Sequence, residues 1–149
     1  HWSEQLGFDI AALKFELRAH IRYLPGALRF LEAARALGKR LLLTTNAHPI
    51  SLAVKDGEAG LAHHFDQMVS SHEFGVPKEQ AEFWTLLGQR HAVDPATTLF
   101  VDDSSLVLEA ARQAGVREIY QVLQPDSTQP LRAALAGITA IRSLADLVT

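Results

Sequence analysis

Two adjacent aspartates, Asp102 and Asp103, are the side chains of this chain best placed to do chemistry. They follow an apolar run at residues 98–101 that is typical of a buried strand. Neighbouring carboxylates at a strand end repel each other unless a cation lies between them, and Mg²⁺ is the commonest hard cation in that position. The alternative is that the pair only caps the helix that begins after Ser104.

A second group of polar side chains follows the apolar run at residues 40–45. Thr45 and Asn46 place a hydroxyl, an amide and free backbone N–H groups at the predicted carboxyl edge of the sheet, where open α/β sheets bind ligands. Thr and Asn are also ordinary turn and cap residues, so this pair alone does not distinguish a ligand site from an ordinary turn. His48 precedes Pro49 and could either contact a ligand or cap the next helix.

Lys78 follows a rigid turn that contains Pro77 and precedes a predicted helix at residues 79–91. Its ammonium could reach back over the same edge of the sheet, although a single surface lysine is usually only solvated. The order of the three groups is the informative feature: Thr-Asn follows one strand, Lys precedes a later helix, and Asp-Asp follows the next strand.

The apolar patterns alternate along the chain in the manner of an α/β fold, in which helices cover a doubly wound, Rossmann-like parallel sheet. The predicted strands span residues 40–45, 65–70, 98–102, 117–123 and 138–141. Helices are predicted before Gly38, around residues 50–54, at residues 79–91, after Asp103, and at residues 130–135 and 143–148. Apolar residues recur at helical spacing in residues 1–20, which are expected to pack outside the sheet.

The composition excludes several classes of function. With 149 residues, of which 48% are hydrophobic, the chain fits one α/β domain. Its 14 Lys and Arg against 17 Asp and Glu include no basic cluster, so a nucleic-acid footprint is missing. No apolar run is long enough to cross a bilayer, and no membrane partner is expected. The absence of cysteine rules out disulfides and thiolate metal sites, and a cytoplasmic location is expected.

These motifs, taken in order, resemble those of the haloacid dehalogenase-like (HAD) hydrolases. Residues 41–46 resemble the second motif of that family, Lys78 the third, and residues 100–104 the fourth. The resemblance implies hydrolysis of small phosphate esters with Mg²⁺ as the cofactor. It also implies that Thr45 and Lys78 hold the phosphoryl oxygens.

The fourth motif implies the metal ligands. By position, Asp103 takes the direct metal role, and Asp102 contributes as a neighbour or through a water molecule. Val107 stands where many relatives carry a further acidic or amide residue, so the outer shell of the metal site departs from the family pattern.

The first motif of the family, an Asp-x-Asp after the first strand, supplies the nucleophile and is missing here. Asp66 and Asp94 lie in the wrong contexts to replace it, and the chain begins at His1 rather than Met. We therefore expect residues 1–20 to be a remnant of a helical cap and residues 21–149 to be the α/β core without its first strand. Such a chain is expected to be inactive alone, and unpaired strand edges make an oligomer possible.

Three stretches, at residues 2–7, 45–49 and 74–79, are similar to those of bacterial GMP/IMP nucleotidases within the HAD group. This closer resemblance implies a nucleoside 5'-monophosphate substrate for the complete protein, with Asn46 and His48 in contact with it. Haloacid dehalogenation, which needs no metal, is disfavoured by the Asp pair. A noncatalytic phosphate-binding or interaction module is the alternative from a different class.

Overall fold

The computed structural model describes residue 18 and residues 21–126 and 128–148. The cap remnant predicted for residues 1–20 lies outside this part of the chain, except for Arg18. In the described part the strands are β1 (Leu42–Thr45), β2 (Gln67–Ser70), β3 (Leu99–Asp102), β4 (Glu118–Val122) and β5 (Thr139–Ile141). The α-helices are α3 (Ala27–Ala36), α4 (Pro49–Ala59), α5 (Ala81–His91) and α6 (Ser105–Gln113).

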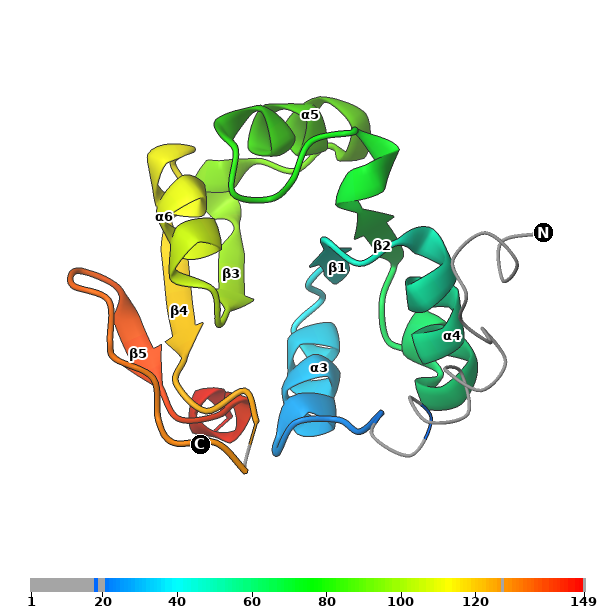
Figure 1. The fold of residues 1–149 in the computed structure, drawn as a ribbon, viewed down its shortest axis with the longest axis vertical. Coiled ribbons are helices and arrows are strands. Elements are labelled where there is room, and N and C mark those ends of the chain that lie inside the picture. The colour runs from blue at the N-terminus through cyan, green and yellow to red at the C-terminus, as the bar shows by residue number, and fades with distance from the viewer. Residues whose placement is uncertain (1–17, 19–20, 127, 149) are drawn as a thin grey trace, which may run out of the picture.

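All strand pairs are parallel, which confirms the predicted α/β class. The strands form two sheets, β1-β2 and β3-β4-β5, and the register sets Leu42 opposite Gln67 and Leu99 opposite Glu118. Figure 1 shows β1 and β3 as the strands of the two sheets that face each other. In the described part of the chain no backbone ladder joins β1 to β3.

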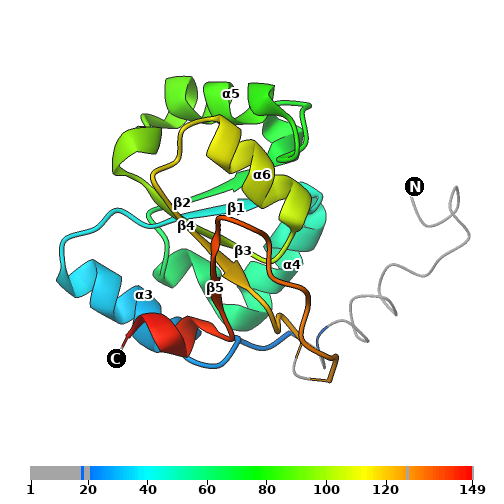
Figure 2. The ribbon, with the colours of Figure 1, turned by 90° about the vertical axis from the view of Figure 1, so that its left-hand side faces the viewer.

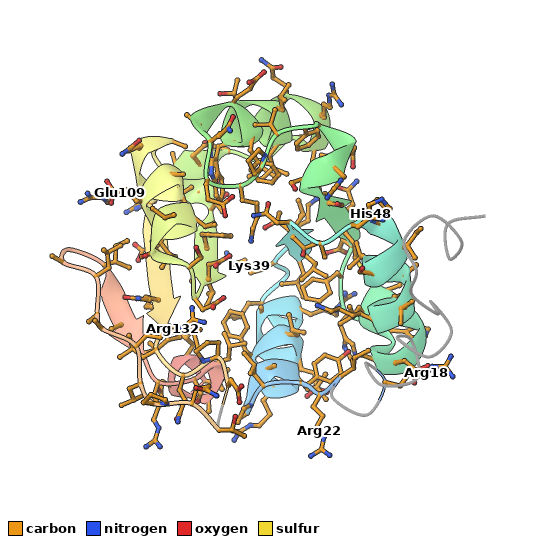
Figure 3. All side chains as sticks on the ribbon, in the orientation of Figure 1. Arg18, Arg22, Lys39, His48, Glu109 and Arg132 are labelled. Atoms are coloured by element: carbon orange, nitrogen blue, oxygen red, sulfur yellow. The ribbon has the colours of Figure 1, made fainter. Side chains whose placement is uncertain are left out.

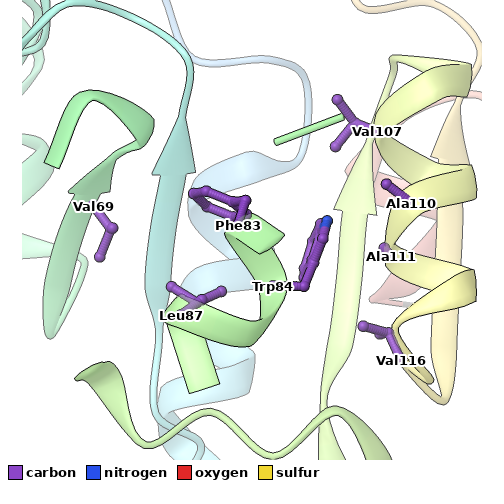
Figure 4. Packing of buried hydrophobic residues seen from close by; sticks show 8 residues of the cluster. All are labelled: Val69, Phe83, Trp84, Leu87, Val107, Ala110, Ala111 and Val116. Atoms are coloured by element: carbon purple, nitrogen blue, oxygen red, sulfur yellow. The ribbon is translucent and has the colours of Figure 1, made fainter. Parts of the chain in front are cut away.

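Helix α5 carries the core that connects the two sheets. Its Phe83 is fully buried, and the neighbouring Trp84 is only 5% exposed. The indole of Trp84 packs edge-on against Phe100 of β3, with ring centroids 4.8 Å apart. Figure 4 shows Phe83 and Trp84 between the strands, in a cluster that also contains Val69, Leu87, Val107, Ala110, Ala111 and Val116. Since this cluster draws on β2, α5 and α6, both sheets share one hydrophobic core.

The helices lie on both sides of the strands. Figure 2 shows α5 and α6 on one side, and α3 with the short 3₁₀ helix η4 (Leu144–Leu147) on the other. Helix α3 ends as predicted near Gly38, which has a φ of 68°, a left-handed conformation that glycine adopts at low cost. In the described ranges, no helix is both long enough and apolar enough to span a membrane.

The helix predicted at residues 130–135 is wrong, because these residues are not helical. The backbone N–H of Arg132 donates to Leu123 O at 2.8 Å. The buried side chain of Gln121 accepts from Leu135 N at 2.7 Å and donates to Ala133 O at 3.2 Å. Backbone groups that a helix would pair internally are therefore paired with β4 and the residues after it.

The closing helix predicted at residues 143–148 is shorter than expected. It is the 3₁₀ helix η4, which begins after Ser143. The Ser143 side chain accepts a hydrogen bond from a backbone N–H, and the Asp146 carboxylate accepts one from the backbone N–H of Ser143, which is a capping box.

Candidate functional site

The ammonium of Lys78 lies where the carboxyl ends of the two sheets meet. Its Nζ donates to the carboxylate of Asp102, at the end of β3, at 2.7 Å, and to the carbonyl of Thr44, in β1, at 3.3 Å. The side chains of Lys78 and Asp102 are 9% and 11% exposed. Because a buried charge needs a close partner, this ion pair fixes both groups at one edge of the fold.

Asn46 ties the loop after β1 to the turn before α5. Its Oδ1 accepts from the backbone N–H of Lys78 at 3.0 Å, and its Nδ2 donates to the two carboxylate oxygens of Glu79 at 3.1 and 2.9 Å. The hydroxyl of Thr45 accepts from Ala47 N at 3.0 Å, which shapes the same loop. The sequence did not identify Glu79 as a site residue, since nothing local predicts a bond to a residue 33 positions away.

The two aspartates of the pair have different surroundings. Oδ1 of Asp102 accepts from the backbone N–H groups of Asp103 and Ser104 at 2.8 and 2.9 Å, at the start of α6. Oδ2 of Asp102 accepts from Lys78, so both oxygens of this carboxylate have partners. The side chain of Asp103 is 41% exposed. Asp103 is therefore the member of the pair that solvent or a ligand reaches more easily.

Arg132 is a residue that sequence reasoning missed. Its Nη1 donates to the Asp103 carboxylate and, at 3.0 Å, to the carbonyl oxygen of the same residue. The two ion pairs, Lys78 with Asp102 and Arg132 with Asp103, together carry two positive and two negative charges. A polar residue within a predicted strand, Gln121, was a sequence signal for a segment bound to β4, and in the structure its buried side chain bonds Ala133 O and Leu135 N.

His48 lies at the start of α4, where its side chain caps the helix and its ring contacts the segment after β2. Its Nδ1 accepts from Ile50 N at 3.2 Å, which is a helix cap. Its ring packs edge-on to His72, with centroids 5.1 Å apart. Figure 3 shows His48 beside α4, whereas Arg132 lies on the other side of the molecule, in the segment between β4 and β5.

A shallow groove of about 500 Å³ borders Asn46 and Glu79. The other residues that line it come from the segment between β2 and α5, namely Ser71, His72, Gly75, Val76, Pro77 and Gln80. The groove gives a ligand held near Asn46 a surface that combines polar and apolar groups.

Comparison with known proteins identifies the family. A family model described as haloacid dehalogenase-like hydrolase matches residues 7–115. The chain belongs to this family of HAD-like hydrolases.

Two curated proteins, a nucleotidase and a phosphatase, are similar to this chain. The GMP/IMP nucleotidase YrfG of Escherichia coli (strain K12) is 43% identical over 127 residues, which are 85% of this chain and 57% of that protein. The phosphoserine phosphatase of Thermus thermophilus is 33% identical over 113 residues, which are 75% of this chain and 45% of that protein. The chain thus spans about half the length of these relatives.

Solved structures show the HAD fold. The L-2-haloacid dehalogenase of Xanthobacter autotrophicus superposes with a TM-score of 0.72 at 22% identity, over 97% of this chain and 68% of that one. A HAD-superfamily hydrolase from Geobacter sulfurreducens gives a TM-score of 0.68 at 19% identity, over 89% of this chain and 58% of that one. At these identities the likeness concerns the fold alone.

The chemistry of the donor set fits the Mg²⁺ that is typical of the HAD family. No cluster of three His, Cys, Asp or Glu is present among the described residues. Mg²⁺ needs fewer protein ligands than that, because one or two carboxylates commonly hold it together with water and substrate phosphate. The half-exposed Asp103 can serve as such a carboxylate, with Asp102 beside it.

Proposed function

We propose that this chain is part of a Mg²⁺-dependent phosphomonoester hydrolase that acts on a nucleoside 5'-monophosphate such as GMP or IMP. The observation that carries the proposal is the ammonium of Lys78, which contacts both β1 and Asp102 of β3. Thr45 and Asp103 adjoin these two contact points in the sequence. A phosphoryl group bound at this edge meets a hydroxyl, a cation and a carboxylate together, as phosphoryl transfer requires.

Each residue has a distinct role in this proposal. Thr45 and Lys78 hold the phosphoryl oxygens, and Lys78 also balances the charge of Asp102. Asp103 would hold Mg²⁺, with Asp102 as a neighbouring or water-mediated contributor. The ion neutralises charge on the phosphoryl oxygens when it is bound. Asn46 fixes the phosphate-binding loop against the turn that carries Lys78, and it contacts the substrate together with His48.

The domain organisation is part of the same proposal. Residues 21–149 form the α/β core without its first strand, and residues 1–20 are a remnant of a helical cap. The lack of a backbone ladder between β1 and β3 in the described chain supports this, since a strand placed there would join the two sheets. That strand would bring the Asp-x-Asp motif, whose first carboxylate attacks phosphorus as the ester oxygen leaves. This chain alone is therefore expected to be inactive.

The test uses the full-length protein and a panel of phosphate esters that contains GMP, IMP, AMP and small sugar phosphates. Lys78→Ala is expected to reduce kcat/KM for every ester alike, by about 2–4 kcal/mol of transition-state stabilisation. His48→Ala is expected to change the ratio between purine nucleotides and sugar phosphates.

Three outcomes would contradict parts of the proposal. A preference for sugar phosphates over GMP and IMP would exclude the nucleotidase assignment and leave the phosphatase chemistry intact. Phosphate binding without turnover by the full-length protein would favour a noncatalytic module. Mg²⁺-dependent turnover by the 149-residue chain, lost in Asp103→Ala, would overturn the proposal that it lacks the nucleophile.

A further inference from the structure

The guanidinium of Arg132 contacts the same carboxylate that the proposed function assigns to the cation. Its Nη1 bonds both the side chain and the carbonyl oxygen of Asp103. The two side chains are 50% and 41% exposed, so an ion from solvent has access to the pair. A divalent cation that binds Asp103 must therefore do so next to a fixed positive charge.

Hydrogen bonds of the backbone at Arg132 and the residues after it hold this segment in place. The backbone N–H of Arg132 donates to Leu123 O at 2.8 Å, just beyond the end of β4. One residue later, Ala133 O accepts from the side chain of Gln121, which is only 2% exposed and also accepts from Leu135 N. These bonds hold the backbone at Arg132 and just after it, and from there the guanidinium reaches Asp103.

The contact between Arg132 and Asp103 affects the net charge of the proposed cation site. Lys78 neutralises Asp102 and Arg132 neutralises Asp103, so the four groups carry no net charge. Divalent cations bind oxygen sites whose net charge is negative, and a nearby unit positive charge opposes them. Removing the Arg132 charge would leave this cluster with one net negative charge.

We propose that Arg132 is a positioning residue of the cation site. It holds the Asp103 carboxylate in place and weakens the binding of divalent cations to that carboxylate. The inference rests on the proposed function, because it takes Asp103 as the metal ligand. The cation competes with Arg132 for the Asp103 carboxylate.

The experiment titrates Mn²⁺ into the purified chain, follows free Mn²⁺ by electron paramagnetic resonance, and repeats the titration with Mg²⁺ as competitor. Arg132→Gln is expected to bind Mn²⁺ about tenfold more tightly than the unaltered chain, the size of effect that a unit charge has on a nearby divalent ion in a water-exposed site. Arg132→Lys, which keeps the charge, is expected to bind as the unaltered chain does. Raising the KCl concentration should shrink the difference.

Arg112 provides the matched control. It pairs with Glu109 on α6 at 2.7 Å, and its side chain is 51% exposed, almost the same as that of Arg132. Arg112→Gln is therefore expected to leave Mn²⁺ affinity unchanged. In the double variant Arg132→Gln/Asp103→Asn the gain should disappear, and circular dichroism should show the same fold for all variants.

Several results would overturn the inference. These are an unchanged or weaker affinity in Arg132→Gln, an equal gain in Arg132→Lys, and a gain that survives Asp103→Asn. If no form of the chain binds Mn²⁺, this inference also fails. The proposed hydrolase activity would still be decided separately, by the turnover of the full-length protein.

Discussion

Lys78 and Asp102 form a nearly buried ion pair between a residue that precedes α5 and the last residue of β3, with Nζ and Oδ2 2.7 Å apart. The same Nζ contacts the Thr44 carbonyl in the other sheet at 3.3 Å. One side chain therefore connects the two sheets at the edge where the proposed phosphate site lies. Stability and site geometry depend on the same contact.

Lys78→Met is expected to lower the free energy of unfolding by about 3 kcal/mol, because it leaves the Asp102 carboxylate buried without its cation. The double variant Lys78→Met/Asp102→Asn should recover part of this loss, since the amide carries no charge and its oxygen still accepts from the backbone N–H groups of Asp103 and Ser104. Urea unfolding measures the free energy of unfolding of the two single variants and of the double variant. The exposed pair of Glu109 and Arg112 is the control, and Glu109→Gln should cause no comparable loss. A double variant as unstable as the sum of its single variants would contradict this account.

The carboxyl-edge location of the proposed site residues was predictable from sequence, because parallel strands end at the same edge. The ordered positions of Thr45, Lys78 and Asp102 in the chain sufficed for that prediction. Their bonding partners were not predictable in the same way. The bond of Asn46 to Glu79 joins loops 33 residues apart and has no local signal.

The segment at residues 130–135 shows why local pattern misleads. Its proline start and apolar spacing fit a helix, yet its hydrogen bonds go to the side chain of Gln121 and to Leu123. A tertiary contact thus overrides the local preference, and it is this contact that places Arg132 at the site. The division into two sheets also depends on strand neighbours, which periodicity alone does not specify.

Gly26→Ala is expected to destabilise the chain by about 2 kcal/mol or more. Gly26 caps α3 with a φ of 77°, and a Cβ there would collide with the backbone of Ala145 in η4. Gly57→Ala is the matched control, because Gly57 lies inside α4 with open space around it. Helix propensity predicts that this control stabilises the chain by up to about 1 kcal/mol. Thermal unfolding of both variants would show whether the close approach of α3 to η4 matters.

His48→Ala is expected to cost about 1 kcal/mol of stability, because α4 loses the side-chain cap on Ile50 N. His48→Asn should retain the cap and most of that stability. The two variants therefore separate the cap from the proposed substrate contact. If His48→Asn keeps the purine preference of the full-length enzyme as well, the imidazole itself plays no part in selecting the base.

Tyr23→Phe is expected to change how stability depends on pH in the alkaline range. Burial, and secondarily the negative charge of Asp56, raises the pKa of Tyr23 above 10.0. The folded chain therefore holds the phenolic proton more tightly than the unfolded chain. This contribution is complete below the unfolded pKa and is lost as pH rises through the folded one.

The hydroxyl of Tyr23 also donates to Ala59 O at 2.6 Å, which joins the segment before α3 to the end of α4. The stability difference between the unaltered chain and Tyr23→Phe should therefore be largest near about pH 8 and should shrink toward about pH 11. Urea unfolding across this range provides the measurement. A difference that stays constant with pH would show that the phenol does not titrate with folding.

Trp84 is a fluorescent side chain at the boundary between the two sheets. Its indole N–H donates to Lys78 O at 2.9 Å, and its ring lies against Phe100 of β3. The chain has two tryptophans, Trp2 and Trp84, so a Trp2→Phe background leaves a single indole whose emission depends on the packing around Lys78. A phosphate or metal ion that shifts Lys78 would change the wavelength or intensity of that emission. Occupancy of the site could then be followed in real time without an added dye.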